Sequence, residues 1–311
     1  MKIICSILGV LFLSSLAPAQ RHGTFDFLRL DMNARASGLN GSFVSMTNDP
    51  NVLFYNPASL ATLERPAGSA SFVKHLLDVN AGSLSYAQSF ADVGTFAAGI
   101  SFIDYGSFDE TDESMNVIGS FGARDLSLTA GWGIMIEENL SAGGSLEFIH
   151  SSISGFRSSA IAVGAGVLYQ IPSEQITLGL CIRHLGTQFD PYAGIRENLP
   201  LDVTLGVTKQ PEHLPVLLNL NFHKLNESQS SFFDRLSAFS FGAEFLMSES
   251  VRLRVGYSNE QRTELKLGTT SGLAGFSFGG GILVQEYIID YALNSYGKIG
   301  SIHRISVGMI F

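Results

Sequence analysis

The sequence predicts an all-β fold, a transmembrane β-barrel of about 14 antiparallel strands, and three observations support it. Hydrophobic residues make up 45% of the 311 residues and charged residues only 15%, yet no apolar run of membrane-helix length follows the first 20 residues. Segments of about ten residues alternate between apolar and polar side chains, as in strands with one face towards lipid. The links between these segments alternate between short and long.

Residues 1–19 have the features of a secretory signal peptide. A basic start is followed by an apolar run over residues 3–16 and a small-x-small cleavage pattern at residues 17–19. The run is too short for a comfortable membrane anchor. Cleavage would leave Cys181 as the single cysteine, so no intrachain disulfide is expected. The predicted location is the outer membrane of a Gram-negative bacterium.

Residues 20–66 do not alternate as a strand should. They contain several small residues, Asn-Asp-Pro and Asn-Pro breakers and a short helical pattern near residues 57–63. This segment is therefore not predicted to form a strand of the barrel.

Residues 67–311 carry the barrel pattern. Between residues 201 and 208, for example, leucines and valines alternate with polar residues and glycine. Single-chain bacterial barrels have an even number of strands, and the predicted number of 14 is even. A soluble β-sandwich is disfavoured because nothing in that fold separates short loops from long ones. The predicted strands lie near residues 68–75, 80–90, 93–105, 124–136, 139–151, 158–170, 175–186, 200–209, 214–223, 236–247, 251–259, 272–283, 286–294 and 302–311.

The connections sort into tight turns and longer outer loops, apart from a short first outer link at residues 76–79. The last strand, HRISVGMIF, directs Ile305, Val307, Met309 and Phe311 towards lipid and Arg304 towards the lumen. It is expected to pair with the first strand, so that no strand edge faces lipid. The predicted outer loops are residues 106–123, 152–157, 187–199, 224–235, 260–271 and 295–301.

Charged residues within the predicted strands share the inward phase, because charge on the lipid face would be costly. They carry both signs, which favours ion pairs that fill the interior, and a ligand role for any one of them is the weaker alternative. These residues are Glu147, Arg183, Asp202, Glu244, Arg252, Arg254 and Asp290.

The N-terminal segment carries a recognisable motif. Asn33-Ala34-Arg35-Ala36 precedes a glycine, Asp49 follows, and then comes the stretch Tyr55-Asn56-Pro57-Ala58-Ser59-Leu60. With this motif the chain resembles the FadL-like outer-membrane superfamily and, within it, the PorV/PorQ branch of the type IX secretion system. Residues 189–200, 241–257 and 264–282 are more similar to the PorQ family than to the PorV family.

This resemblance implies a 14-stranded barrel with residues 20–66 folded into or against the lumen as a plug, and Asn33, Arg35, Asn56 and Pro57 as its motif residues. It also implies membership of a cell-surface attachment complex with PorU and PorV that holds a PorZ-like surface protein. Aromatic residues in two predicted outer loops are the first candidates for contacts with such a partner. They are Phe189, Tyr192, Phe232 and Phe233.

Other functions remain open or are disfavoured. A FadL-like transporter of small hydrophobic molecules is the main alternative. The acidic net charge of −9 disfavours nucleic-acid binding, whereas contact with outer-membrane lipid or lipopolysaccharide is expected. The acidic stretch at residues 109–113 lacks the regular spacing of a calcium loop, so a solvated loop is favoured there.

Catalytic signals are weak. The stretch GFSFG at residues 275–279 matches G-x-S-x-G, but it lies within an alternating strand instead of a strand-to-helix elbow. No cofactor fingerprint and no regular metal motif occurs, so neither an enzyme nor a cofactor is expected.

Overall fold

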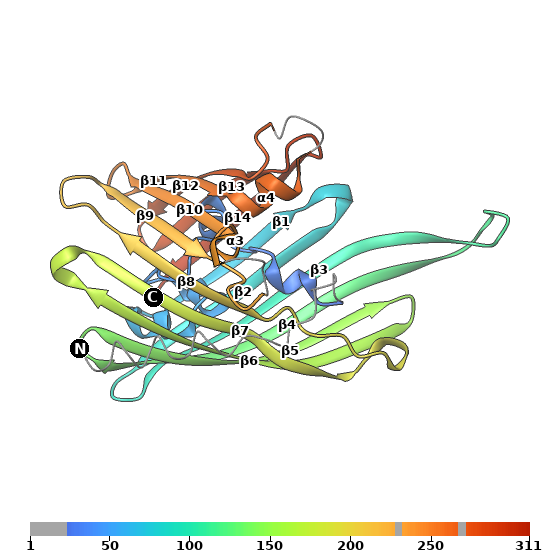
Figure 1. The fold of residues 1–311 in the computed structure, drawn as a ribbon, viewed down its shortest axis with the longest axis horizontal. Coiled ribbons are helices and arrows are strands. Elements are labelled where there is room, and N and C mark those ends of the chain that lie inside the picture. Colours follow the sequence, from blue (N-terminus) through green and yellow to red (C-terminus); the bar gives the residue numbers. More distant parts are fainter. Residues whose placement is uncertain (1–23, 228–231, 267–271) are drawn as a thin grey trace.

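The computed structural model describes residues 24–227, 232–266 and 272–311, so the predicted signal peptide lies outside the described residues. Fourteen antiparallel strands form one closed barrel, which confirms the predicted fold class (Figure 1). The strands are β1 (Ala67–Lys74), β2 (Asn80–Phe90), β3 (Gly94–Thr111), β4 (Val117–Glu137), β5 (Leu140–Ile153), β6 (Phe156–Ile171), β7 (Ile176–Asp190), β8 (Asp202–Lys209), β9 (Val216–Phe222), β10 (Phe239–Leu246), β11 (Val251–Ser258), β12 (Phe276–Val284), β13 (Tyr287–Ser295) and β14 (Ser301–Ile310).

The barrel closes where the sequence predicts. β14 pairs antiparallel with β1, from Ala67 opposite Ile310 to Lys74 opposite His303. Along β14, Ile305 and Val307 are exposed on the outer surface, whereas Arg304 is buried in the interior. Every strand edge at this seam is therefore paired, as a lipid environment demands.

The wall is taller on one side than on the other. β3 to β7 have 14 to 21 residues each, whereas β8 to β14 have 7 to 10. The prediction of an outer loop at residues 106–123 is therefore wrong. Most of these residues belong to β3 and β4, which remain paired with each other there. The predicted loop at 187–199 likewise begins too early, since β7 continues to Asp190. Cross-strand hydrogen bonds continue these strands past the membrane-facing part. The alternation of apolar and polar residues ends with that part, so it does not reveal the extensions.

β7 contains a β-bulge opposite β6. The pairing shifts between Val163 and Ala165, and His184 has a positive φ of 58°. An inserted residue reverses the alternation beyond it. Arg183 and the next residue, His184, therefore both line the interior.

The N-terminal segment lies inside the barrel as a plug, shown in blue in Figure 1. Asn33, Asp49 and Asn56 accept hydrogen bonds from backbone N–H groups at the starts of its short helices, which satisfies donors that a helix start leaves free. Among the described residues, no helix is long and apolar enough to cross a membrane. The plug helices are η2 (Asp26–Arg29), α2 (Ala34–Gly38), η3 (Pro50–Phe54) and η4 (Pro57–Thr62).

The remaining short helices lie in connections between strands. They are η5 (Leu76–Asp78), η6 (Pro172–Glu174), η7 (Tyr192–Gly194), α3 (Phe232–Arg235) and α4 (Asn259–Glu264).

Glycines in the wall let the plug approach closely. A Cβ added at Gly143 would lie 2.4 Å from the Pro57 carbonyl carbon, and one at Gly256 would lie 2.6 Å from the Leu39 carbonyl carbon. Real Cβ atoms do not come this close to backbone atoms. The plug therefore packs directly on the wall backbone at these positions.

Candidate functional site

Two cavities lie inside the barrel, on opposite sides of the plug. The end of the barrel with tight turns, such as residues 138–139, is called the short-turn end, and the opposite end the long-loop end. The loop-side cavity has a volume of about 360 Å³ and the turn-side cavity about 410 Å³. Asn33 of the plug lines both. The plug is thus the layer that separates the two cavities.

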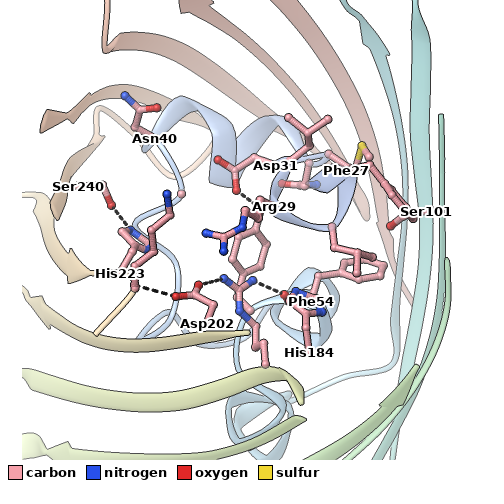
Figure 2. A pocket seen from close by; sticks show the side chains of 18 of the residues that line it. Phe27, Arg29, Asp31, Asn40, Phe54, Ser101, His184, Asp202, His223 and Ser240 are labelled. Carbon is pink, nitrogen blue, oxygen red and sulfur yellow. Dashed lines mark hydrogen bonds and ion pairs between the residues drawn. The ribbon is translucent and has the colours of Figure 1, made fainter. Parts of the chain in front are cut away.

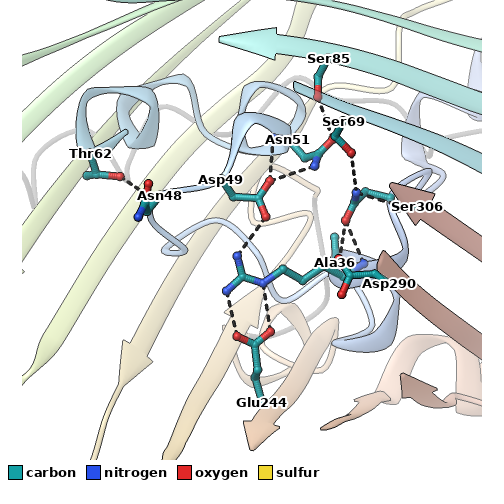
Figure 3. A network of polar contacts seen from close by, with 12 residues as sticks. Ala36, Asn48, Asp49, Asn51, Thr62, Ser69, Ser85, Glu244, Asp290 and Ser306 are labelled. Carbon is teal, nitrogen blue, oxygen red and sulfur yellow. Dashed lines mark hydrogen bonds and ion pairs between the residues drawn. The ribbon is translucent and has the colours of Figure 1, made fainter. Parts of the chain in front are cut away.

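A group of ion pairs, called the plug cluster, joins the plug to the wall (Figure 3). It consists of Arg35 and Asp49 of the plug and Glu244, Arg254 and Asp290 of the wall. Arg35 Nε and Nη2 donate to the two carboxylate oxygens of Glu244 at 3.0 and 2.9 Å, and Nη1 donates to Asp49 Oδ2 at 3.0 Å. Arg254 Nε donates to Glu244 Oε2, and its Nη1 donates to Asp290 Oδ1, both at 2.6 Å. Every carboxylate in the cluster therefore contacts an arginine.

The plug cluster is closed to solvent at its centre. The side chains of Glu244 and Arg254 have 0% exposure. Room for Arg254 and Asp290 comes from Gly281, where an added Cβ would lie 2.2 Å from Asp290 Oδ1. Removing one partner of a pair buried this deeply leaves an uncompensated charge in a medium of low polarity. The cluster is therefore expected to fix the position of the plug.

The plug side of this cluster is neutral, and its wall side becomes neutral when the neighbouring Arg252 is counted with it. Arg35 and Asp49 balance one another on the plug. On the wall, Glu244 and Asp290 face Arg254 and also Arg252, which lies two residues earlier on β11 and lines the turn-side cavity. The side chain of Arg252 makes no hydrogen bond or ion pair with any residue that the structure describes. Separating plug from wall would therefore leave no net charge among these two plug side chains or among these four wall side chains.

A second group, the cavity cluster, comprises Glu147, Arg183, His184 and Asp202 and lines the loop-side cavity (Figure 2). Arg183 Nη2 donates to Asp202 Oδ2 at 2.7 Å, and Arg183 Nη1 donates to the carbonyl oxygen of Phe54 at 2.9 Å. His184 Nδ1 lies 2.9 Å from Glu147 Oε2. Arg183 Nε and His184 Nε2 are buried without a hydrogen-bond partner among the described residues.

The plug supplies an apolar side to the same cavity. Tyr55 packs its ring 5.8 Å from the Arg183 guanidinium, and its hydroxyl donates to Asp31 Oδ1 at 2.8 Å. The cavity therefore combines an apolar side with a charged one. The apolar lining residues of the plug include Phe27, Leu28, Leu30, Met32, Leu53 and Phe54.

The predicted charge network thus separates into two groups. Glu244, Arg254 and Asp290 belong to the plug cluster, whereas Glu147, Arg183 and Asp202 belong to the cavity cluster. The seventh residue, Arg252, lies beside the plug cluster without a bonded partner in the described part of the chain.

The four plug-motif residues have structural contacts. Asn33 accepts from the N–H groups of Arg35 and Ala36, and its Nδ2 lies 3.4 Å from Ser306 Oγ. Asn56 Nδ2 donates to the Val44 carbonyl at 2.9 Å. Pro57 opens η4. These contacts place the motif at the points where the plug turns and meets the wall.

The aromatic residues predicted in outer loops do not gather into one described surface. Phe189 lies in β7 and packs against Phe148 on the outside of the barrel, with ring centroids 6.2 Å apart. Tyr192 is partly buried and donates to Ser151 Oγ at 2.9 Å. Phe232 and Phe233 begin α3, but their side chains lie outside the described part.

The acidic stretch and the G-x-S-x-G stretch also have structural contacts. Asp112 accepts hydrogen bonds from Ser114 and Asn116 in a tight turn, which lowers the pKa of its carboxyl group. No group of three or more metal-ligating side chains occurs among the described residues. Ser277 is fully buried and donates to the Gly38 carbonyl at 3.0 Å. This serine fastens the plug to β12.

The sequence did not reveal His184 as a lumen residue, and it gave no contacts for the inward-facing Arg304. His184 faces inward because of the bulge, which no simple alternation reveals. Arg304 was given an inward phase but no role; its Nε donates to the Asp31 carbonyl and its Nη1 to Asn294 Oδ1. Inward serines and asparagines of the strands were a usable signal, because many of them bond the plug backbone.

Comparison with known proteins identifies the fold. No protein-family model matches the chain, and no curated protein sequence matches it. Among solved structures, the Ralstonia pickettii toluene transporter TbuX matches with a TM-score of 0.62 and 12% identity, over 90% of this chain and 98% of that one. The fold is that of the FadL-like barrels.

Two further solved structures match the same fold. The Pseudomonas putida toluene transporter TodX matches with a TM-score of 0.57 and 14% identity, over 89% of this chain and 96% of that one. A Pseudomonas aeruginosa FadL homologue matches with a TM-score of 0.55 and 12% identity, over 90% and 98% of the two chains. At these identities the likeness concerns the fold alone.

Proposed function

We propose that this protein is an outer-membrane channel that admits a small molecule at the loop-side cavity and releases it at the turn-side cavity. The observation that carries this proposal is the pair of cavities separated by a single plug, with Asn33 lining both. The FadL-like fold and the apolar outer surface support a location in the outer membrane. Passage requires the plug to shift within the lumen.

The charge balance of the plug cluster supports such a shift. Moving a buried ion away from its partners is costly, but Arg35 and Asp49 would move together as a neutral pair. Glu244 would keep its bond to Arg254. Arg252 supplies the second positive charge on the wall. Displacement therefore breaks hydrogen bonds without exposing an unbalanced charge.

The loop-side cavity favours a ligand with an apolar body and a polar or anionic head. Its volume lies in the range of small-molecule pockets, roughly 300–1,000 Å³. Phe27 and Phe54 offer an apolar side, and Arg183 and His184 carry buried nitrogen atoms without partners in the described part of the chain. A polar head group would satisfy them, which removes the free-energy cost of leaving such atoms unpaired. TbuX and TodX are described as toluene transporters, so an aromatic body is our first choice.

Uptake into lipid vesicles tests this proposal. Purified protein in vesicles should take up labelled benzoate faster than protein-free vesicles, with saturation at high concentration. Arg183→Gln should reduce this uptake at least about tenfold, since one charge-assisted hydrogen bond contributes roughly 1.5–3 kcal/mol. The exterior substitution Leu205→Val is the matched control. Uptake equal to that of protein-free vesicles, with a correctly folded barrel, would contradict the proposal.

A second candidate function is a scaffold in the type IX secretion attachment complex, as the resemblance to the PorV/PorQ branch implies. One observation favours it: the plug is fastened by the ion pair between Arg35 and Glu244, whose side chains are only 11% and 0% exposed, which suits a permanently closed barrel. Under this proposal PorU, PorV and a PorZ-like surface protein are the partners. Affinity purification from detergent-solubilised outer membrane should then recover those proteins together with the barrel. Recovery of the barrel alone would exclude this role.

A further inference from the structure

β3 and β4 extend beyond the rest of the barrel as a two-stranded ribbon (Figure 1). β2 pairs with β3 only as far as Asp104, and β5 pairs with β4 only as far as Ala123. Beyond these residues, β3 and β4 pair as strands only with each other, although the Gly122 carbonyl still accepts a hydrogen bond from the Ser154 N–H. We call residues 105–122 the outer ribbon. From Asp104 to the turn at Asp112 it measures about 25 Å along the strand, at roughly 3.3 Å per residue.

The outer ribbon exposes apolar side chains well away from the membrane-facing surface. Met115 is 86% exposed, Ile118 64%, Val117 63% and Phe108 43%. At its base, the exposed ion pair between Arg124 and Asp104 marks the end of the apolar outer surface. Lipid therefore does not account for the exposed apolar groups of the ribbon.

The ribbon is also strongly acidic. Residues 105–122 include Asp109, Glu110, Asp112 and Glu113 but no lysine or arginine. Like charge repels an anionic lipid surface and also the ribbon of a second copy of this chain. The complementary surface is one that combines basic residues with an apolar groove.

The ribbon has two strand edges that pair with no other strand in the part of the chain that the structure describes. An isolated two-stranded hairpin is marginally stable in water, and unpaired edges invite an added strand. Within the ribbon, Phe108 and Phe121 stack across the strands with centroids 5.5 Å apart, and Asp112 fixes the turn through three hydrogen bonds. The ribbon is thus preorganised, while its edges and apolar side chains stay available for contact with a partner.

We propose that the outer ribbon is a docking site for a second protein whose surface carries basic residues and an apolar groove beside a free strand edge. The partner pairs its backbone with one edge of the ribbon, and its basic residues meet Asp109, Glu110 and Glu113. This proposal does not depend on small-molecule passage through the lumen.

Site-specific photo-crosslinking in cells that produce the full-length protein tests the proposal. A benzoylphenylalanine is placed at Met115 or Val117 on the ribbon and, as a control, at Leu273, which is 59% exposed at the same end of the barrel. The ribbon positions should give one crosslinked protein of defined mass, absent from the control. Mass spectrometry then identifies it, and its surface should carry a basic patch.

A charge variant provides the second measurement. Asp109→Asn, Glu110→Gln and Glu113→Gln together remove three negative charges and keep the Asp112 turn. With purified barrel and the identified protein, this variant should weaken binding at least about tenfold and reduce its dependence on salt. Heat-modifiable gel mobility confirms that the barrel is folded.

Three results would overturn the proposal. They are the absence of a crosslinked protein from the ribbon, a crosslink only to lipopolysaccharide or to a second copy of the chain, and an affinity that the charge variant leaves unchanged.

Discussion

The plug cluster and the cavity cluster both pair arginines with carboxylates inside one barrel, but they connect different parts of it. The plug cluster joins the plug to the wall through Arg35 and Glu244. The ion pairs of the cavity cluster lie within the wall, as between Arg183 and Asp202, and among the described residues its one hydrogen bond to the plug goes to a backbone carbonyl. The first arrangement holds the plug against the wall, whereas the second lines a cavity. Substitutions in the two clusters should therefore differ in their effects.

The largest effect is expected from Glu244→Ala. The substitution leaves Arg35 and Arg254 buried without this carboxylate, which should lower the free energy of unfolding by about 3–5 kcal/mol. Denaturant unfolding of the purified barrel in detergent measures the change. Glu286→Ala, in an exposed tight turn, serves as the control. A loss no larger than that of the control would show that the plug cluster does not stabilise the fold.

A methyl group added to the wall where the plug touches it should lower the stability of the barrel. Gly143→Ala places a methyl group 2.4 Å from the Pro57 carbonyl carbon and should cost about 2 kcal/mol. Gly144→Ala is a closely matched control, since its added Cβ meets only the Gly164 carbonyl oxygen at 3.7 Å. The same unfolding assay compares them. Equal stability of the two variants would mean that the plug does not lie against β5 at this position.

In the cavity cluster, Asp202→Asn should have a smaller effect on stability. The amide oxygen can still accept from the Lys224 N–H, so about 1 kcal/mol is expected. Benzoate uptake should nevertheless fall, because Arg183 loses its ionic partner. A stability loss as large as that of Glu244→Ala would remove the distinction between the clusters.

A pH effect is the smallest prediction. His223 follows β9 and lines the loop-side cavity. Burial lowers its pKa from the ordinary value of 6.5; Asp202 opposes this shift, and Arg183 adds to it. Its contribution to stability is therefore fully present above pH 6.5 and is lost as the pH falls through the lowered pKa. His223→Gln should flatten the pH dependence of unfolding over that range; an unchanged profile would contradict this assignment.

The sequence predicted the wall better than the contents of the lumen. Alternation depends on the contrast between lipid and interior, so it located fourteen strands and the pairing of β14 with β1. The outer ribbon was missed because water surrounds both of its faces and imposes no alternation. His184 was missed because a bulge reverses the phase of β7.

The plug contacts have a different origin. Glu244 lies 209 residues after Arg35 in the sequence, and the two meet only once the barrel has closed around the plug. The alternation pattern shows which charged side chains face the lumen and therefore need partners. It does not show which residues those partners are.

A disulfide lock tests most directly whether the plug must move for passage. The hydroxyl oxygens of Ser42 on the plug and Ser240 on β10 lie 2.9 Å apart, so Ser42→Cys with Ser240→Cys, in a Cys181→Ser background, should allow a crosslink. We predict that the oxidised protein blocks benzoate uptake into vesicles and that a reductant restores it to the rate of the background protein. Uptake at the same rate by fully crosslinked and by reduced protein would show that passage does not require the plug to move.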